Sequence, residues 1–419
     1  MNDQPRFPGV LGPAEPFLNP LDAILADLAI SVQLPAGLHA KTGARYEAIR
    51  KHVERPGSPL YGRVLCFYPQ GSMTIDATIS TRGTDDEYDL DVVVELDVPE
   101  EMSPEEVLDL LESAVADYPV QAVERQSRCI TLRYADNMHV DLTPSRRLAT
   151  AKDRESVIFH AKQSEPRHLH KPVMMNAWAF GRWYNARTPM EERFALAYNK
   201  RLYEADGIEF MADADVHLVP TQTPLIVKNT ATVALQLIKR FRNVLYASTA
   251  GRIPPSVMLS CHAGKAALPG MLLSDMVIRQ ARWTARAIEA ASRQGQLLDV
   301  RNPEWDEDRF TDRWPENKMQ QDAFAAALRD LADGLQAIKQ GDVQLEDLQD
   351  WLRNRFGDRV VSKTLRTFND RTGHAIRALE QGYTRKGGLF VPAAPAIISS
   401  VAAASPVAAS SHTNMGERR

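Results

Sequence analysis

Cysteine is scarce in this chain of 419 residues, which has only three, at positions 66, 129 and 261. They are far apart and odd in number, so the sequence predicts neither a disulfide framework nor a Cys-x-x-Cys zinc site. Small buried thiols in a reducing cytosol are the better interpretation.

The chain also lacks long apolar runs and a strong charge of one sign. No segment approaches membrane-spanning length, and the N-terminus lacks a basic-then-apolar signal pattern, so we expect a cytoplasmic protein without membrane contact. The 50 Lys and Arg residues against 54 Asp and Glu residues give a net charge of −4. A broad nucleic-acid-binding surface is therefore not indicated, and we expect no sequence-specific nucleic acid partner.

A glycine–serine turn follows the first strongly apolar segment. Residues 64–68 predict a strand, and Gln70, Gly71 and Ser72 come soon after it. Glycine lets the backbone approach a ligand closely, while amides and a hydroxyl can donate hydrogen bonds to phosphate. Taken alone, the turn is better explained by a serine that caps a helix. The acids downstream favour a phosphate-binding role.

Two aspartates, Asp89 and Asp91, lie in a segment whose residues 92–94 favour a strand. Alternation places both on one face and their apolar neighbours on the other. Carboxylates so close repel each other and lose hydration unless a cation lies between them. Mg²⁺ prefers such ligands and often shares them with phosphates. The acids at 85–87 are expected to be a solvated surface.

A third acid, Asp141, lies in the apolar segment 138–142. Residues 129–134 and the turn-like 135–137 precede it, which predicts a hairpin that could bring Asp141 beside Asp89 and Asp91. Three carboxylates around two metals, with a phosphate-holding turn, are the groups that in-line nucleotidyl transfer needs.

The ordered set of Gly-Ser, Asp-x-Asp and a strand Asp resembles the polymerase-β-like nucleotidyltransferase superfamily. Two segments are similar, more narrowly, to the bacterial CD-NTases, which are cGAS/DncV-like cyclic-oligonucleotide synthases of antiphage signalling. These segments are Gln70-Gly71-Ser72 with Ala77-Thr78, and Glu87-Tyr88-Asp89-Leu90-Asp91. The resemblance covers roughly residues 40–385.

The resemblance implies an α+β fold with the active site in a cleft between two lobes. A mixed-sheet nucleotidyltransferase lobe with an N-terminal brace helix is expected at 20–225, and a helical lobe at 226–391. Residues 1–19 are expected to be irregular. Residues 392–419, rich in Ala, Ser, Pro and Val, are expected to form a disordered tail that an accessory protein could engage.

The resemblance also implies Mg²⁺-dependent synthesis of a cyclic oligonucleotide from NTPs. Asp89, Asp91 and Asp141 would coordinate two Mg²⁺, and Asp141 would help to activate the attacking ribose hydroxyl. Gln70, Gly71 and Ser72 would hold the triphosphate. The expected product is a cyclic dinucleotide containing adenine, made from ATP with GTP as a second candidate substrate.

Two further residues are matched to phosphate ligands of the resembled enzymes. Lys239 lies in the apolar helical pattern of residues 231–246, where a lysine on the helix surface is the alternative interpretation. Ser256 follows Pro254-Pro255 at a predicted helix start, where a serine could equally be an N-cap. The sequence leaves both alternatives open.

Other functions remain as alternatives. A template-independent enzyme making linear products would need a basic acceptor channel, which the net charge does not favour. A catalytically inactive nucleotide-binding scaffold would not need the intact carboxylate trio. A glycosyltransferase would explain Asp89-x-Asp91 but not Gly71-Ser72 or Asp141. His168 and His170 could indicate a metal, but no third ligand is evident, and an exposed loop is the better interpretation.

Apolar spacing and cap residues predict the helices of the chain. They are expected at 21–32, 44–53, 103–116, 172–187, 231–246, 273–293, 317–339, 344–356 and 360–381.

Overall fold

The computed structural model describes residues 16–17, 19–34, 36–80, 88–149, 152–205, 228–249, 251–341, 345–377, 382–383 and 389–390. Four expectations therefore fall outside the described residues. They concern the tail at 392–419, most of the irregular N-terminus, the acids at 85–87 and the lobe boundary at 225/226.

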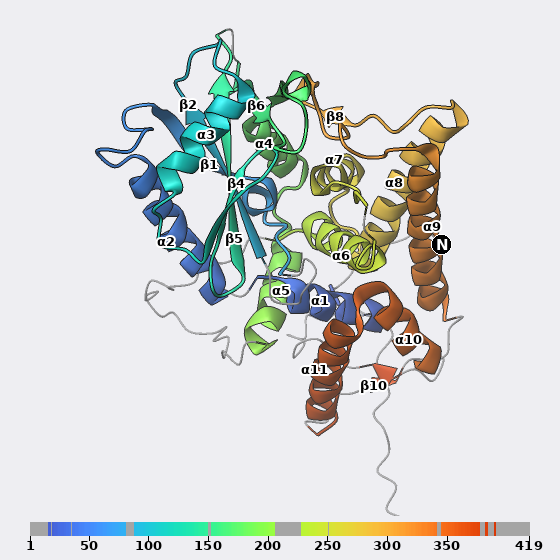
Figure 1. Ribbon diagram of the computed structural model, residues 1–419. Helices are drawn as coiled ribbons and strands as arrows, with labels where there is room; N and C mark the ends of the chain where they lie inside the picture. Colours follow the sequence, from blue (N-terminus) through green and yellow to red (C-terminus); the bar gives the residue numbers. More distant parts are fainter. Residues whose placement is uncertain are drawn as a thin grey trace, which may run out of the picture.

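The N-terminal half is built on a mixed seven-stranded sheet (Figure 1). Its central order is β1-β2-β5-β4-β3, with β6 joined to β5 and β7 joined to β6; only β2 and β5 pair in parallel. The strands are β1 Val64–Gln70, β2 Tyr88–Leu96, β3 Ala122–Arg125, β4 Ile130–Arg133, β5 Met138–Arg147, β6 Ser156–His160 and β7 Lys171–Met175. The predicted hairpin of β4 and β5 is confirmed, and it places β5 beside β2.

Two helices cover one face of this sheet, α2 (Ala36–Val53) and α3 (Pro104–Val115) (Figure 1). Leu90, Val92 and Val94 of β2 point to this face, where they share a buried apolar cluster with side chains of both helices. Ser103 and Glu106 form the capping box that starts α3. Because side chains alternate along a strand, Asp89 and Asp91 point to the opposite face, toward the rest of the molecule.

The second buried cluster is helical and lies beside the sheet (Figure 1). It contains side chains of α1, of α4 to α11 and of residues 75–79. These helices are α1 Pro20–Val32, α4 Ala177–Arg187, α5 Glu192–Ala205, α6 Thr230–Leu245, α7 Ser256–Ala266, α8 Leu273–Arg293, α9 Lys318–Gln340, α10 Leu345–Phe356 and α11 Asp358–Arg377. Short elements complete the chain: the 3₁₀ helices η1 Gly71–Ile75 and η2 Arg167–Leu169, and strands β8 Arg301–Asn302, β9 Trp305–Arg309, β10 Gly382–Tyr383 and β11 Leu389–Phe390.

One predicted helix begins in the wrong place. Residues 171–175, at the start of the helix expected at 172–187, form strand β7 and pair with β6. The side chain of Asn176 then accepts a hydrogen bond from the amide of Ala179 and caps α4, so the helix starts only at Ala177. The aromatic spacing was correct for α4, but it could not show that the five residues before it extend the sheet.

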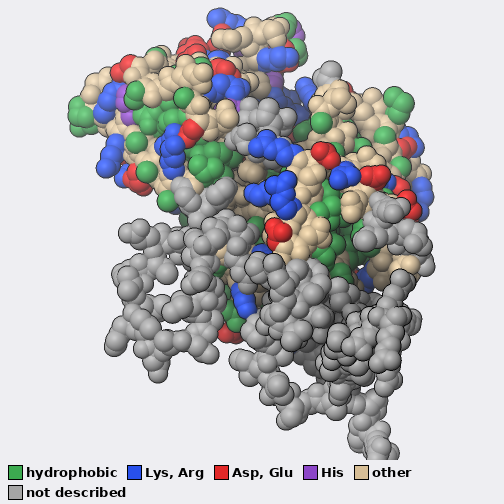
Figure 2. All heavy atoms as spheres, turned by 90° about the horizontal axis from the view of Figure 1, so that it is seen from below, with side chains coloured by type: hydrophobic (Ala, Val, Ile, Leu, Met, Phe, Trp, Pro, Cys, Tyr) green, Lys and Arg blue, Asp and Glu red, His purple; other side chains and the backbone are tan. Residues whose placement is uncertain are grey.

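The first two helices, which follow each other in the chain, belong to different buried clusters. Helix α2 is longer than the predicted 44–53 and belongs to the sheet cluster, while α1 belongs to the helical cluster. None of the helices in the described ranges combines the length and the apolar character needed to cross a membrane. Seen from below, Lys and Arg side chains lie in small groups with acidic side chains among them (Figure 2).

Candidate active site

Asp91 and Asp141 are directly paired across neighbouring parallel strands. The register of β2 and β5 places Asp91 opposite Asp141 and Asp89 opposite His139. Both Asp91 and Asp141 also raise the pKa of the nearby Cys129 thiol, for which burial is the larger cause. The two carboxylates therefore lie on the same face of the sheet, and alternation along β2 adds Asp89 to that face.

The glycine of the turn lies against one of these acids. Gly71 follows β1, whose last residue Gln70 is paired with Asp91. Its φ of +65° lies in the left-handed region, and a Cβ placed on it would be only 2.5 Å from Asp91 Oδ2. A residue with a side chain would thus be strained and would displace the carboxylate. The sequence predicted the turn and the acids separately, and the structure brings them together.

Two neighbours orient the acids. Thr131 of β4 is paired with Asp141 and donates a hydrogen bond of 2.6 Å from its hydroxyl to Asp141 Oδ1. His139 Nδ1 is 3.7 Å from Asp89 Oδ1, and its other ring nitrogen is 2.7 Å from Arg133 Nη1. Sequence reasoning missed Thr131 and His139. Strand alternation could have found both, because Thr131 shares the face of Asp141 once the hairpin register is known.

The carboxylates fit a hard divalent cation. Asp89, Asp91 and Asp141 offer oxygen ligands from adjacent strands, and the missing side chain of Gly71 lets Asp91 Oδ2 lie against the turn. Within the described ranges, no three His, Cys, Asp or Glu side chains form a group that could hold a metal ion by themselves. Such an open arrangement suits Mg²⁺, which commonly takes one or two carboxylates and completes its shell with water and phosphate oxygens.

The hydroxyl of Ser72 is held inside the turn. Thr78 Oγ1 lies 3.2 Å from Ser72 Oγ and donates to it, and the amide of Ala77 donates to the carbonyl of Ser72 at 2.9 Å. Gln70 donates from Nε2 to Thr143 Oγ1 at 3.3 Å, which fixes the end of β1 against β5. Of the three predicted turn residues, Gln70 thus ends β1, and Gly71 and Ser72 begin η1, with Gly71 against Asp91.

Lys239 is buried, which contradicts the alternative of a helix surface lysine. Only 4% of it is exposed, and its ammonium donates a 2.8 Å hydrogen bond to the carbonyl of Ala77, six residues after Gly71. Two buried neighbours contact the same segment: Lys228 and Gln236 donate to the carbonyl of Asp76 at 2.5 and 3.3 Å. Burial lowers the pKa of Lys228 to about 8, while the charge of Asp76 acts in the opposite direction.

Ser256 is the first residue of α7, and Pro255 occupies the N-cap position. The N-cap alternative for Ser256 is therefore wrong, because Pro255 holds the extended backbone that a cap requires. The Ser256 hydroxyl accepts a 2.9 Å hydrogen bond from Arg242, which also donates to the carbonyl of Pro254.

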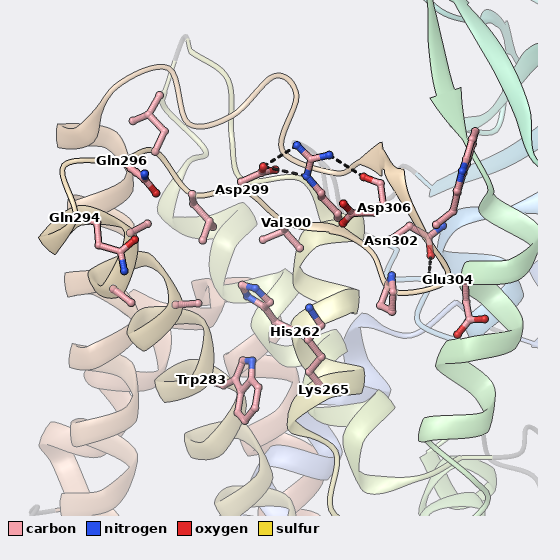
Figure 3. A pocket seen from close by; sticks show the side chains of 18 residues that line it. His262, Lys265, Trp283, Gln294, Gln296, Asp299, Val300, Asn302, Glu304 and Asp306 are labelled. Carbon is pink, nitrogen blue, oxygen red and sulfur yellow. Dashed lines mark hydrogen bonds and ion pairs between the residues drawn. The ribbon is translucent and has the colours of Figure 1, made fainter.

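A separate cavity of about 810 Å³ lies among α7, α8 and residues 296–306 (Figure 3). His262, Lys265 and Trp283 line it, and none of the predicted site residues does. Burial lowers the pKa of His262 to about 3, so this ring is neutral, and Nδ1 lies 3.2 Å from the hydroxyl of Thr284.

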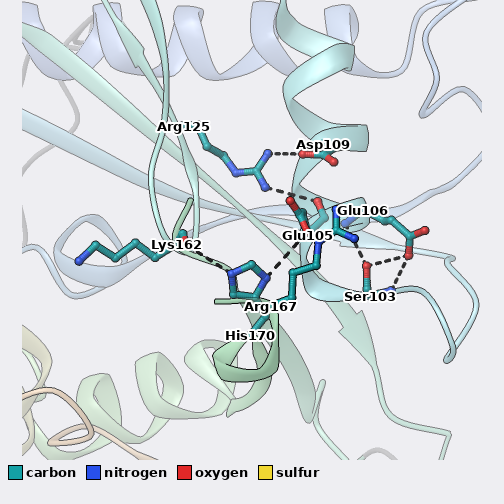
Figure 4. Close-up of polar contacts among 8 residues, drawn as sticks. All are labelled: Ser103, Glu105, Glu106, Asp109, Arg125, Lys162, Arg167 and His170. Atoms are coloured by element: carbon teal, nitrogen blue, oxygen red, sulfur yellow. Dashed lines mark hydrogen bonds and ion pairs between the residues drawn. The ribbon is translucent and has the colours of Figure 1, made fainter. Parts of the chain in front are cut away.

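The second histidine of the His168-Leu169-His170 segment has protein partners. One ring nitrogen of His170 lies 3.3 Å from the carbonyl of Lys162 and the other 4.0 Å from Glu105, beside the start of α3 (Figure 4). His168 is exposed on η2.

A mixed sheet that pairs two acids on neighbouring strands beside a Gly-Ser turn is the arrangement expected of a nucleotidyltransferase. Residues 66–144 match the family described as cyclic GMP-AMP synthase DncV-like, nucleotidyltransferase domain. The chain is 63% identical over 407 residues to the cyclic dinucleotide synthase CdnG of Bradyrhizobium diazoefficiens, covering 97% of each chain. A c-di-GMP synthase of Roseivirga ehrenbergii is 24% identical over 58% of this chain and 60% of its own length.

The fold agrees with these similarities. The solved structure of the Bradyrhizobium diazoefficiens CD-NTase CdnG in complex with GTP superposes with a TM-score of 0.78 and 62% identity, covering 84% of this chain and 99% of that one. The chain therefore belongs to the CD-NTase family of DncV-like nucleotidyltransferases, and the predicted α+β nucleotidyltransferase fold is confirmed.

Proposed function

We propose that this enzyme synthesises a cyclic dinucleotide from NTPs in a Mg²⁺-dependent reaction. The observation that carries the proposal is the pairing of Asp91 with Asp141 beside Gly71. The carboxylates and the turn are adjacent, which supports a metal site and a phosphate site side by side. The 63% identity to a cyclic dinucleotide synthase supports the same conclusion.

The carboxylates act at the reacting atoms. Two Mg²⁺ bound with the substrate supply charge neutralisation for the pyrophosphate leaving group and activation of the attacking hydroxyl. Asp89 and Asp91 provide the anionic face on which the donor triphosphate is aligned. Asp141 would accept the proton of the attacking ribose hydroxyl. Thr131 donates a 2.6 Å hydrogen bond to Asp141 Oδ1, which orients the carboxylate for this role.

The turn holds the donor triphosphate. The amides of Gly71 and Ser72 and the Ser72 hydroxyl are the donors that a phosphate oxygen needs. The side chain of Gln70 positions the strand end from which the turn begins. Lys239 adds positive charge next to the turn, because its ammonium is held at the carbonyl of Ala77, six residues after Gly71. Ser256, at the start of α7, is the remaining proposed phosphate contact.

Two transfers at this one site complete the product. The first links two nucleotides. The linear intermediate then turns in the cleft, so that its second hydroxyl attacks its own triphosphate and closes the ring. The relative from Bradyrhizobium diazoefficiens was solved with GTP, and the relative from Roseivirga ehrenbergii is a c-di-GMP synthase. We therefore propose GTP as a substrate. The adenine expected from the sequence remains a prediction.

Mass spectrometry of the products from all four NTPs with Mg²⁺ tests this function. We expect a cyclic dinucleotide and release of two pyrophosphates for each product molecule. Linear oligonucleotides alone would favour the template-independent alternative, and nucleotide binding without turnover would favour the inactive scaffold. Either result would overturn the proposal.

The cellular role follows from the product. A cyclic dinucleotide is a diffusible messenger, which is consistent with the predicted cytoplasmic location and antiphage signalling. An accessory protein that engages residues 392–419 remains an expectation from the sequence.

A further inference from the structure

Three consecutive main-chain carbonyls that follow the Gly-Ser turn are held by side chains of α6 and of Lys228, which lies just before this helix. We call these three side chains the carbonyl anchor. Its hydrogen bonds run from Lys228 Nζ to Asp76 O (2.5 Å), from Lys239 Nζ to Ala77 O (2.8 Å) and from Gln236 Nε2 to Thr78 O (3.0 Å).

The three side chains of the carbonyl anchor are buried. Lys228, Gln236 and Lys239 are 2%, 0% and 4% exposed, so the hydrogen bonds that they make to protein replace those that water would give. Gln236 and Lys239 are three residues apart in α6 and so share one face of the helix, and Lys228 reaches the same segment from just before the helix. The cost of burying two ammonium groups is offset only while the carbonyls stay in place.

The anchored segment packs as part of the helical cluster. Ile75, Ala77 and Ile79 belong to the same buried cluster as α6 and α8, although the strands on either side of them pack against α2 and α3. Alternate apolar side chains therefore fix this segment by burial, and the carbonyl anchor fixes the same segment by hydrogen bonding.

The anchored segment contacts the Ser72 hydroxyl directly. Thr78, whose carbonyl is held by Gln236, places its own Oγ1 3.2 Å from Ser72 Oγ. The amide of Ala77, whose carbonyl is held by Lys239, donates to the carbonyl of Ser72 at 2.9 Å. Displacing residues 76–78 would therefore displace the hydroxyl and amides that face the phosphate.

We propose that Lys228 and Gln236 are positioning residues that fix the triphosphate-binding turn to the helical lobe through the carbonyls of residues 76–78. The assignment rests on the proposed function of that turn. Neither side chain needs to touch the nucleotide. Both keep the turn in the conformation that receives phosphate. This conformation stabilises the bound nucleotide equally in the ground state and in the transition state.

The test compares Gln236→Leu and Lys228→Met with wild type. Gln280→Leu is the matched control, because Gln280 is also buried in the helical cluster and donates at 2.7 Å to a main-chain carbonyl, that of Ala231, away from the turn. The first measurement is hydrogen exchange of the peptide 71–79 in the full chain without nucleotide. The second is the KM and kcat of NTP turnover.

We expect faster exchange at 71–79 in both anchor variants and not in the control. We also expect KM to rise on the order of ten-fold while kcat changes by less than about three-fold, because the loss of one hydrogen-bonded anchor weakens binding rather than chemistry. Lys228→Arg should restore part of the lost affinity. If Lys228→Met does not fold, Gln236→Leu carries the test alone.

Three results would overturn the assignment. Unchanged exchange and KM in folded Gln236→Leu would show that the anchor does not position the turn. Equal effects in Gln280→Leu would show general loosening of the helical cluster. A KM that rises in Lys228→Met but not in Gln236→Leu would show that Lys228 acts by attracting the nucleotide through its charge and not by holding the turn. If wild type makes no product, the proposed function fails instead, and the exchange measurement still decides whether the anchor holds the turn.

Discussion

Gly71→Ala should inactivate the enzyme without unfolding it. Gly71 has a φ of +65°, and an added Cβ would lie 2.5 Å from Asp91 Oδ2 and 3.2 Å from its Cγ. An ordinary contact begins near 3.4 Å, so the carboxylate or the turn must move by about 0.9 Å. The methyl group is small, but it lies where Asp91, the proposed metal ligand, meets the turn that we propose binds phosphate.

Two effects set the expected magnitudes: the left-handed backbone at position 71 and the displacement at Asp91. Placing alanine in the left-handed region costs roughly 1–2 kcal/mol of folding stability. A displacement of about 1 Å between reacting groups costs on the order of 100-fold in rate. The stability loss is moderate for a chain of this size, so the folded variant should be obtained and its turnover measured.

Gly62→Ala is the matched control. Gly62 has a similar φ of +71°, and a Cβ added there meets nothing within 4 Å. Both substitutions therefore carry the same backbone cost, and only Gly71→Ala disturbs Asp91. The assay is pyrophosphate release from NTPs with Mg²⁺, alongside thermal unfolding of both variants. If Gly71→Ala keeps turnover within about three-fold of Gly62→Ala, the contact with Asp91 is not needed for catalysis, and the proposed site is wrong.

Three further predictions follow from individual side chains. Asp89→Asn with Asp91→Asn should lower turnover roughly a thousand-fold or more, because the anionic metal ligands are lost. Folding should survive, since like-charge repulsion is relieved, and Asp97→Asn, an exposed acid just beyond the same strand, should be nearly neutral in the same assay. Lys239→Met should raise KM more than it lowers kcat, and an unchanged KM would remove Lys239 from the phosphate site. Burial lowers the pKa of His262 from 6.5 to about 3. Between these two pH values the imidazole is protonated in the unfolded chain and neutral in the folded chain. The free energy of unfolding should therefore fall as pH drops below 6.5. Between pH 6.5 and 4, the Tm of His262→Gln should depend less steeply on pH than the Tm of wild type, and equal slopes in the two proteins would contradict this.

The acids could be predicted from the sequence because their positions depend on local rules. Strand alternation fixes the common face of Asp89 and Asp91, and the turn at 135–137 fixes the hairpin that carries Asp141 next to them. The roles of Thr131 and His139 required the register between strands. That register depends on side-chain packing over residues that are distant in the sequence.

The carbonyl anchor shows a different limit. In the sequence, Gln236 and Lys239 look like ordinary polar positions on an amphipathic helix and Lys228 looks like a loop lysine before it, and solvent exposure is the usual outcome for all three. Their burial depends on three carbonyls about 150–160 residues earlier in the chain. A helical pattern shows which residues share a face, but it does not show what that face will contact. For the same reason, Lys239 could be placed on the helix but not assigned to a surface or a core.

The site draws its two parts from different cores. The acids are fixed by the sheet, whose opposite face packs on α2 and α3, whereas the residues after the turn are fixed in the helical cluster by Ile75, Ala77 and Ile79. The two parts meet at Gly71, where an added Cβ would lie 2.5 Å from Asp91 Oδ2. Glycine is the residue whose backbone adopts the left-handed conformation at this junction at least cost. The geometry of the phosphate turn relative to the acids is thus set by how the two lobes pack.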